Sequence, residues 1–174
     1  TVLFILPLII TLLADLSLNR AITWSGYVAG AITLTYIVAV LPYWFPKPNP
    51  VIFVAIDFIV IGVFLLYINL ETGGRWFLSF ALPVTAGAMI ITTSVIALIR
   101  YVRKGYFFII GGAFILTGAF TVLIEFLLNI TFDLRYKLIW SYYPLIVLAL
   151  IGIALIVIGC SKTLRESLYK KFFI

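Results

Sequence analysis

Six long apolar runs, separated by short polar segments, constrain this chain more than any other feature. A helix needs roughly 20 apolar residues to cross a hydrocarbon layer about 30 Å thick. The runs are continuous and show no alternation of apolar and polar residues, which excludes the strands of a membrane β-barrel. We therefore predict an all-α integral membrane protein with a transmembrane domain over residues 1–160. Its six spans are expected at residues 1–18, 24–45, 50–70, 76–99, 105–129 and 139–160.

The composition agrees with a chain that has the bilayer as its solvent. It is 65% hydrophobic and 10% charged, with a mean hydropathy of +1.27. A soluble domain is usually about 45–50% apolar and 25% charged. The net charge of +6 comes from basic residues at the ends of the apolar runs, where they face lipid headgroups rather than nucleic acid. The expected partners are membrane lipids, with anionic lipid at the basic cytoplasmic face, and a protein partner.

The connections between the runs are short, so neighbouring spans are expected to run antiparallel in an up-and-down bundle. Three connections share a pattern of Asp or Asn, then Leu, a basic residue and Trp. They are "DLSLNRAITW" (Asp15–Trp24), "NLETGGRW" (Asn69–Trp76) and "DLRYKLIW" (Asp133–Trp140). Much of this pattern follows from an interfacial position, where Trp is common. The shared Asp/Asn-Leu pair favours three repeats of one hairpin.

The distribution of Lys and Arg predicts the orientation of the spans. The loops after the first, third and fifth spans carry four basic residues, whereas the other loops and the C-terminal tail carry eight. The basic side faces the cytoplasm, so we expect a multi-pass protein of the cell membrane with both termini cytoplasmic. The four basic residues of the outer side are Arg20, Arg75, Arg135 and Lys137.

The tail, residues 161–174, is predicted to form a cytoplasmic amphipathic helix. Leu164, Leu168 and Phe172 recur every four residues, with charged residues mostly on the other side. Such a helix suits the inner headgroup layer, and the alternative is a segment that binds a protein partner.

Glycine and proline residues predict where the spans approach each other and where one bends. Gly26 and Gly30 form a GxxxG pair, and glycines also recur in the fifth and sixth spans. Small residues let helix backbones approach closely in lipid, where apolar side chains supply no net driving force. Pro83 lies inside the fourth span and is expected to kink it.

Asp57 is the deepest charged residue, seven positions after Pro50 and so about 10 Å along a helix from the cytoplasmic end. Tyr36, Thr92 and Thr93 are expected near its level, where their hydroxyls can donate hydrogen bonds. Because no Lys or Arg lies at that depth, a neutral, protonated Asp57 fits the sequence. Two interpretations stay open: a proton or cation site, or a hydrogen-bonded packing residue.

Asp15 and Glu125 lie within about one turn of the outer boundary. The simpler interpretation is a set of ion pairs that link neighbouring hairpins through the outer basic residues. The alternative is an outward-facing polar pocket with amides from Asn19, Asn69 and Asn129. The candidate wall of this pocket, here called the outer rim, consists of Arg20, Trp24, Arg75, Trp76, Arg135 and Trp140.

Signatures of catalysis and of cofactor binding are missing from the sequence. It contains no GxSxG element, no phosphate-binding glycine loop, no histidine and only one cysteine, Cys160. A His/Cys metal cluster is therefore excluded. We expect a protein that is not an enzyme, with no catalytic residues, no metal and no cofactor.

The segments "NRAITWSGYVAGAITLTYIV" (Asn19–Val38) and "LRESLYKKFFI" at the end of the chain carry a family resemblance. In these segments and in its six spans, the chain resembles a family of uncharacterised bacterial multi-span membrane proteins. Members of that family typically have a cysteine-rich zinc ribbon before the membrane part. The resemblance implies that this chain, which lacks such cysteines, is the membrane portion without that domain. It implies no activity and no functional residues.

Two functions fit these observations. The first is a non-enzymatic membrane domain that anchors or senses for a cytoplasmic partner or for a missing N-terminal domain. The second is a small transporter or channel that uses Asp57 or Glu125. A transporter needs these carboxylates to line a cavity that water can reach, whereas an anchor predicts that polar partners seal both of them.

Overall fold

The computed structural model describes residues 2–102, 105–134 and 137–161, and within these ranges every regular element is a helix. The contacts divide the chain into two compact units between Phe77 and Leu78, which are described separately. Arg135 and the predicted amphipathic tail beyond Ser161 lie outside the described residues. The elements are α1 (Val2–Asn19), α2 (Ser25–Ala39), the 3₁₀ helix η1 (Leu41–Trp44), α3 (Pro50–Glu71), the π-helical turn η2 (Phe77–Ala81), α4 (Leu82–Tyr101), α5 (Tyr106–Phe132) and α6 (Tyr142–Cys160).

In the part of the chain that the structure describes, four helices are long and apolar enough to cross a membrane. They are Pro50–Glu71, Phe77–Tyr101, Tyr106–Phe132 and Tyr142–Cys160. The apolar parts of the first two helices, Leu3–Asn19 and Ser25–Ala39, are shorter. The structure therefore agrees with an all-α membrane protein and shows four helices of spanning length.

The second predicted span, residues 24–45, is not one continuous α-helix. The α-helix ends at Ala39, and a 3₁₀ turn with Pro42 near its start continues to Trp44. Proline has no N–H to donate and its ring crowds the preceding turn, so it stops the regular α-helix here. The next helix begins cleanly, because the side chain of Asn49 accepts the N–H of Val51 at 3.2 Å.

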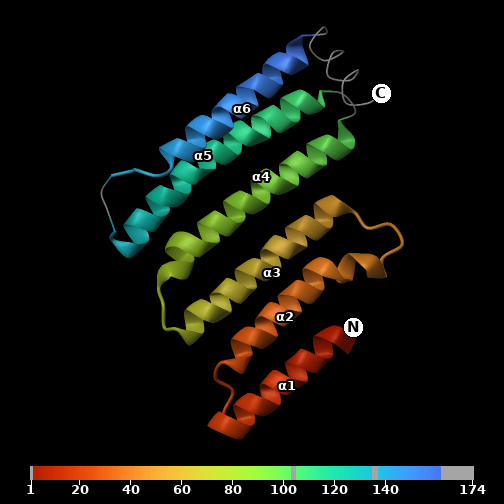
Figure 1. The fold of residues 1–174 in the computed structure, drawn as a ribbon, viewed down its shortest axis with the longest axis vertical. Coiled ribbons are helices and arrows are strands. Elements are labelled where there is room, and N and C mark those ends of the chain that lie inside the picture. Colours follow the sequence, from red (N-terminus) through yellow and green to blue (C-terminus); the bar gives the residue numbers. More distant parts are fainter. Residues whose placement is uncertain (1, 103–104, 135–136, 162–174) are drawn as a thin grey trace. The chain divides into compact units, whose positions relative to one another are not determined.

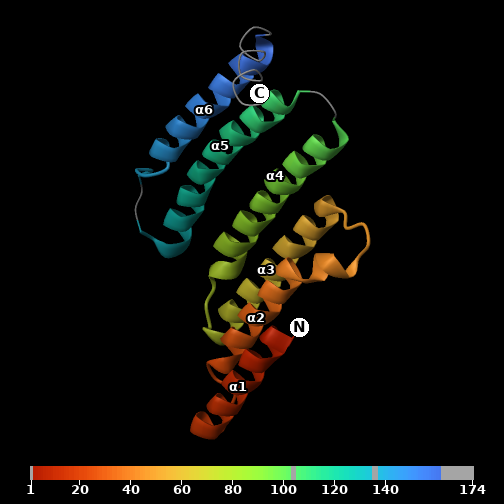
Figure 2. The same cartoon turned by 45° about the vertical axis from the view of Figure 1, so that its right-hand side comes forward.

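In the first unit, α1, α2 and α3 lie side by side in one row, with successive helices antiparallel (Figures 1 and 2). The middle helix, α2, packs against both neighbours. Its two glycines form the contact with α3: the hydroxyl of Tyr67 lies against Gly26, and the ring of Phe64 lies against Gly30. The GxxxG pair thus makes room for two aromatic side chains of the neighbouring helix rather than for its backbone.

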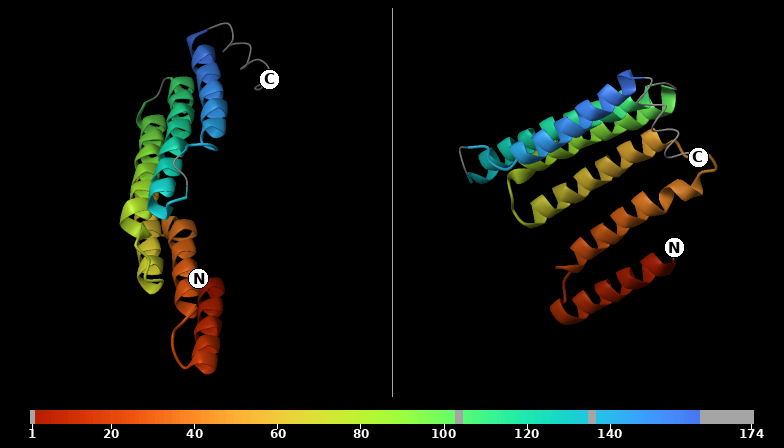
Figure 3. Two further views of the ribbon diagram at one scale, coloured as in Figure 1. Left: turned by 90° about the vertical axis from the view of Figure 1, so that its left-hand side faces the viewer. Right: turned by 45° about the horizontal axis from the view of Figure 1, so that its top comes forward.

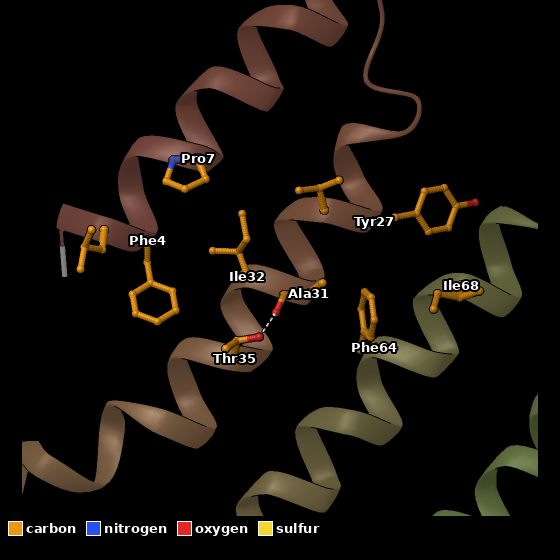
Figure 4. Close-up of a pocket in the computed structure, with 10 residues that line it drawn as sticks. Phe4, Pro7, Tyr27, Ala31, Ile32, Thr35, Phe64 and Ile68 are labelled. Carbon is orange, nitrogen blue, oxygen red and sulfur yellow. Dashed lines mark hydrogen bonds between the residues drawn. The ribbon is translucent and has the colours of Figure 1, made fainter.

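An apolar groove of about 640 Å³ lies along this row of helices (Figure 4). The hydroxyl of Thr35, one of its few polar groups, donates to the carbonyl oxygen of Ala31 at 2.8 Å. The groove therefore offers an apolar surface with a satisfied hydroxyl. Its lining consists of Leu3, Phe4, Pro7, Tyr27, Val28, Ala31, Ile32, Thr35, Phe64 and Ile68.

In the second unit, α5 packs against α4 on one side and most extensively against α6 on the other (Figure 3). The α5–α6 contact brings two backbones together at Gly111 and Gly152. A Cβ atom at Gly111 would lie 2.7 Å from the carbonyl oxygen of Gly152, and a Cβ at Gly152 would lie 2.6 Å from that of Gly111. The close approach requires glycine at both positions, as the sequence predicted for the fifth and sixth spans.

The fourth predicted span changes its helical type next to Pro83. The turn Phe77–Ala81 is π-helical and the α-helix starts at Leu82, so Pro83 lies in its first turn. A wider π turn accommodates a residue that cannot complete the regular hydrogen-bond ladder. The irregularity that was predicted as a kink is thus a π turn before the proline.

The burial pattern is the reverse of that in a soluble protein. Among the described residues, the fully buried side chains are polar, namely Asp15, Ser25 and Ser141, and the buried hydrophobic ones are Phe77 and Ala81. Large apolar side chains are exposed along all six α-helices. Extensive exposed apolar surface is uncommon on soluble monomers, so this pattern is expected where lipid surrounds the helices.

Candidate functional site

In the α1–α2 hairpin, Asp15 projects from the last part of α1 and is fully buried. Its Oδ1 accepts the side-chain amide of Asn19 at 2.7 Å and the hydroxyl of Thr23 at 2.6 Å. Its Oδ2 accepts the backbone N–H groups of Thr23 and Ser25 at 2.7 and 3.0 Å, and the hydroxyl of Ser25 at 2.6 Å. One carboxylate therefore holds both the connecting segment and the first residue of α2.

In the α5–α6 hairpin, Glu125 has the equivalent position and is 2% exposed. Its Oε1 accepts the backbone N–H groups of Ile139 and Trp140 at 2.7 and 3.3 Å. Its Oε2 accepts the N–H of Ser141 at 2.9 Å. This carboxylate gathers three consecutive backbone donors immediately before α6.

The connection after α3 uses an amide in the same place. The side-chain oxygen of Asn69 accepts the N–H of Phe77 at 3.2 Å, and its backbone oxygen accepts the N–H of Gly74 at 2.9 Å. The side chain of Trp76 lies close to Gly74, where a Cβ atom would be 2.6 Å from the indole nitrogen. The glycine-rich turn therefore lets the indole lie against the connecting segment.

The three connections share one arrangement. In each, a buried oxygen near the end of one helix accepts the backbone N–H of the residue that directly follows the tryptophan. The residues concerned are Ser25, Phe77 and Ser141, at the starts of the following helices. We call this arrangement the cross-hairpin cap. The resemblance between the three sequence motifs thus has a structural counterpart, although the acceptor in the third hairpin is Glu125 and not Asp133 of the motif.

The cross-hairpin cap answers a specific physical need. The first N–H groups of a helix have no acceptor within that helix, and in hydrocarbon such a group is costly because no water replaces the acceptor. A carboxylate is also favoured at a helix N-terminus because the helix dipole is positive there. Bonds from N–H groups to a charged oxygen are stronger than neutral ones. Asp15 and Glu125 are therefore placed to stabilise the turns.

These partners differ from the ones that the sequence predicted. We expected Asp15 and Glu125 to pair with basic residues of neighbouring hairpins, but the hydrogen bonds described above all come from their own hairpins. Arg20 and Arg75 have exposed side chains. The donors that the structure shows at these two carboxylates are backbone N–H groups, hydroxyls and an amide, and ion pairs that involve Arg75 or Arg135 stay a prediction.

The outer rim is divided between the two units. Trp24 and Trp76 lie in the first unit and Trp140 in the second, so a pocket that all three enclose stays a prediction. The side chains of Trp24 and Trp140 are exposed. Exposed tryptophans beside helix starts are typical of the interface between hydrocarbon and headgroups.

Asp57 lies on α3, and Tyr36 is the one of its predicted hydroxyl partners that belongs to the same unit. Its Oδ1 is buried and has no hydrogen-bond partner among the described residues. The ring of Tyr36 packs against those of Phe4 and Trp44, at centroid distances of 5.4 and 6.1 Å. The hydroxyl of Thr93 donates to the carbonyl oxygen of Met89 in its own helix.

The remaining predicted partner, Thr92, belongs with Thr93 to the second unit, so hydrogen bonds from these two hydroxyls to Asp57 stay a prediction. A threonine in a helix can satisfy its hydroxyl with a carbonyl oxygen of the preceding turn, as Thr93 does.

From the sequence we did not identify the groups that donate hydrogen bonds to the two carboxylates. Ser25, Thr23 and Ser141 were not singled out as partners of the two carboxylates, although Trp-Ser occurs at both Trp24 and Trp140. The detectable signal was a polar residue within two turns of the end of a span, followed by Trp-Ser at the start of the next span. This signal recurs because the serine is where the next helix needs an external acceptor.

The described residues contain no group of three or more His, Cys, Asp or Glu side chains that could hold a metal ion. Comparisons with protein-family models, with curated proteins and with solved structures found no match. The resemblance to a zinc-ribbon-bearing membrane family therefore stays a prediction. The geometry shows two buried carboxylates, Asp15 and Glu125, whose oxygens all accept hydrogen bonds and hold turns together. A third carboxyl group, that of Asp57, has a buried oxygen with no hydrogen-bond partner among the described residues.

Proposed function

We propose that this chain is a non-enzymatic membrane domain that anchors or senses for a cytoplasmic partner or for a further N-terminal domain. The observation that carries the proposal is the use of Asp15 and Glu125 as cross-hairpin caps. Both are buried, and each oxygen accepts at least one hydrogen bond. Carboxylates in this state hold helices in place and leave little capacity for acid–base chemistry or for binding an ion.

The proposal includes six spans with both ends in the cytoplasm. The 18 residues of α1 fall within the range of about 17–25 that spans a bilayer. The second span comprises α2 together with η1, from Ser25 to Trp44. An even number of spans and the excess of Lys and Arg on one side support the common location of the termini.

Single cysteines in a Cys160→Ser background test this topology with a membrane-impermeant maleimide. We expect Arg20→Cys and Lys137→Cys to react in intact cells, and Lys47→Cys to react only after permeabilisation. The Cys160→Ser parent gives the background. Reaction of Arg20→Cys and Lys47→Cys from the same side would show that the segment between them does not cross the membrane.

The basic cytoplasmic face supports binding of anionic lipid. Lys47 lies in the segment before α3 and Arg100 in the last turn of α4, both with exposed side chains, and basic residues at such positions attract anionic headgroups. Replacing both by Gln should weaken the preference for vesicles that contain phosphatidylglycerol, measured by lipid retention during purification. The matched control is the double Gln variant of the outer residues Arg20 and Lys137, which should keep that preference.

A small transporter or channel is the second candidate, and the unpartnered Oδ1 of Asp57 is the observation that favours it. Reconstitution of the purified chain into liposomes separates the two candidates. An anchor gives no proton or cation flux above that of empty liposomes. A flux that Asp57→Asn abolishes would replace the anchor by the transporter.

A further inference from the structure

Asp57 lies on the same face of α3 as Phe64. It is seven residues before Phe64, and two helical turns bring side chains at that spacing to the same face. Phe64 in turn lies against Gly30 of α2. Because α2 and α3 are antiparallel, the part of α2 that follows Gly30 lies beside the part of α3 that precedes Phe64 (Figure 1).

No described basic residue lies near Asp57 along the helices of the first unit. Arg20, Lys47 and Arg75 all belong to connecting segments, and α1, α2 and α3 contain neither Lys nor Arg in the described residues. The titratable groups on α2 are Tyr27 and Tyr36.

The titratable groups on the other elements of this unit are also remote in sequence or already engaged. On α3 they are Tyr67 and Glu71, at least ten residues away. On α1, Asp15 is held by its own hairpin. On the segment before α3, which contacts it through Phe45 and Phe53, they are Tyr43 and Lys47. Asp57 is thus a carboxyl whose buried Oδ1 has no partner among the described residues, in a unit whose three α-helices carry no Lys or Arg.

The ligand that fits a single carboxyl is a proton. A metal cation takes several oxygen ligands, and the described residues contain no cluster of three or more acidic, His or Cys side chains. An ionised carboxylate in hydrocarbon is costly without a partner, and protonation removes its charge without any further ligand. A carboxylic acid also leaves an O–H that can serve as a donor.

We propose that Asp57 is a proton-binding site within the membrane. The carboxylate takes one proton from water at the Pro50 end of α3 and returns it when the pH is raised. This proposal rests on the membrane location proposed above and not on the anchoring or transporting function. It distinguishes Asp57 from Asp15 and Glu125, whose oxygens face donors and therefore need to stay ionised.

Dicyclohexylcarbodiimide, an apolar reagent that adds to protonated carboxyls from the lipid phase, tests this distinction. The full chain is reconstituted in vesicles of phosphatidylcholine and phosphatidylglycerol, treated at a series of pH values and mapped by peptide mass spectrometry. We expect a stable adduct on Asp57 at neutral pH and little on Asp15 or Glu125. Once the pH exceeds the pKa of Asp57, labelling should fall about tenfold per pH unit.

A water-soluble carbodiimide with an added amine provides the control, because it modifies carboxyls that water reaches, such as Glu71. We expect it to spare Asp57. Labelling of Asp57 by the water-soluble reagent, or absence of labelling by the apolar one throughout the pH series, overturns the proposal. The topology experiment is independent, so failure of the membrane location is separable from failure of the proton site.

Infrared difference spectroscopy supplies a second readout that does not depend on chemical reactivity. The carbonyl stretch of a protonated carboxyl should be present in the wild type and in Asp57→Glu. It should be absent in Asp57→Asn. An unchanged band in Asp57→Asn, or no such band in the wild type at neutral pH, contradicts the proposal.

Discussion

The α1–α2 and α5–α6 hairpins bury a carboxylate in equivalent places but surround it with different donors. Asp15 accepts two backbone N–H groups, two hydroxyls and an amide, whereas the donors to Glu125 described above are backbone N–H groups alone. Hydroxyls can rotate and can also accept, but backbone N–H groups can only donate. The first hairpin therefore has an adaptable cap and the second has a fixed one.

The helices of the two hairpins also differ in how they meet. In α5, the buried residues Gly111, Gly118 and Glu125 recur every seven positions and form one face towards α6. The cap of this hairpin thus continues a contact between two backbones. In the first hairpin, the polar residues of the turn, Asn19 and Thr23, form part of the cap. In the α5–α6 hairpin, where the helices are in close contact, backbone N–H groups supply the hydrogen bonds described for the carboxylate. In the α1–α2 hairpin, polar side chains of the turn supply hydrogen bonds as well.

Removal of either carboxylate should produce the largest loss of stability. Asp15→Ala leaves two backbone donors without this acceptor and Glu125→Ala leaves three. Each buried N–H that loses its acceptor costs about 1–3 kcal/mol. Unfolding of the purified protein in detergent should therefore occur at lower denaturant in both variants, and earliest in Glu125→Ala. If the two variants unfold like the wild type, the caps do not stabilise the hairpins.

The amide variants test the difference in donors. In Glu125→Gln, one oxygen becomes an NH₂ group that faces either Ser141 N–H or the pair from Ile139 and Trp140. This variant should lose about half of the stability that Glu125→Ala loses. The measurement is the same detergent unfolding assay.

Asp15→Asn is the matched variant and should be close to wild type. Its amide oxygen can keep the backbone donors, while its NH₂ can donate to the hydroxyl of Thr23 after that hydroxyl rotates and to the side-chain oxygen of Asn19 after that amide flips. If Asp15→Asn is as unstable as Glu125→Gln, the cap of the first hairpin adapts to an amide no better than that of the second.

Glycine variants of α5 test the close contact of the second hairpin. Gly111→Ala places a methyl group against the backbone of α6 and should cost about 1–3 kcal/mol through overpacking. The control is the adjacent Gly112→Ala, whose Cβ atom meets nothing within 4 Å. The control should be neutral or stabilising by up to about 1 kcal/mol, because alanine favours a helix over glycine. Equal effects of the two variants would show that α6 does not lie against Gly111.

The two serines of the caps should give the smallest and most diagnostic difference. The hydroxyl of Ser25 donates to Asp15, whereas that of Ser141 lies near Glu125 without a hydrogen bond of standard geometry among the described residues. Ser25→Ala should cost about 1 kcal/mol, and Ser141→Ala should cost less. The same unfolding assay measures both, and a reversed order would contradict the assignment of the hydroxyls.

Part of the fold could be predicted because it depends on local composition. Runs of about 20 apolar residues predicted helices of spanning length, and four of the helices have that length. The early end of α2 was missed even though Pro42 was visible, because an apolar run continues through it to Phe45. Hydropathy reports which solvent a segment prefers, but the backbone hydrogen bonds decide where the α-helix ends.

The sequence identified the residues of the candidate site but not the roles that they have in the structure. Asp15, Glu125 and Asp57 were all selected, because a carboxyl group in an apolar run needs an explanation. The sequence did not show that the first two accept N–H groups 10 and 16 residues away. Nor did it show that the buried Oδ1 of Asp57 has no hydrogen-bond partner among the described residues. These hydrogen bonds depend on the path that the connecting segment takes between the two helices of a hairpin.

The sequence by itself showed that the apolar segments suit a lipid environment and that the fold is all-α. It also showed which residues need polar partners. These properties follow from composition and from the length of each apolar run. Only the tertiary structure decided which partner each polar residue has. A carboxylate accepts whichever donor the folded chain brings within about 3 Å, and at Asp15 and Glu125 that donor is the start of the next helix.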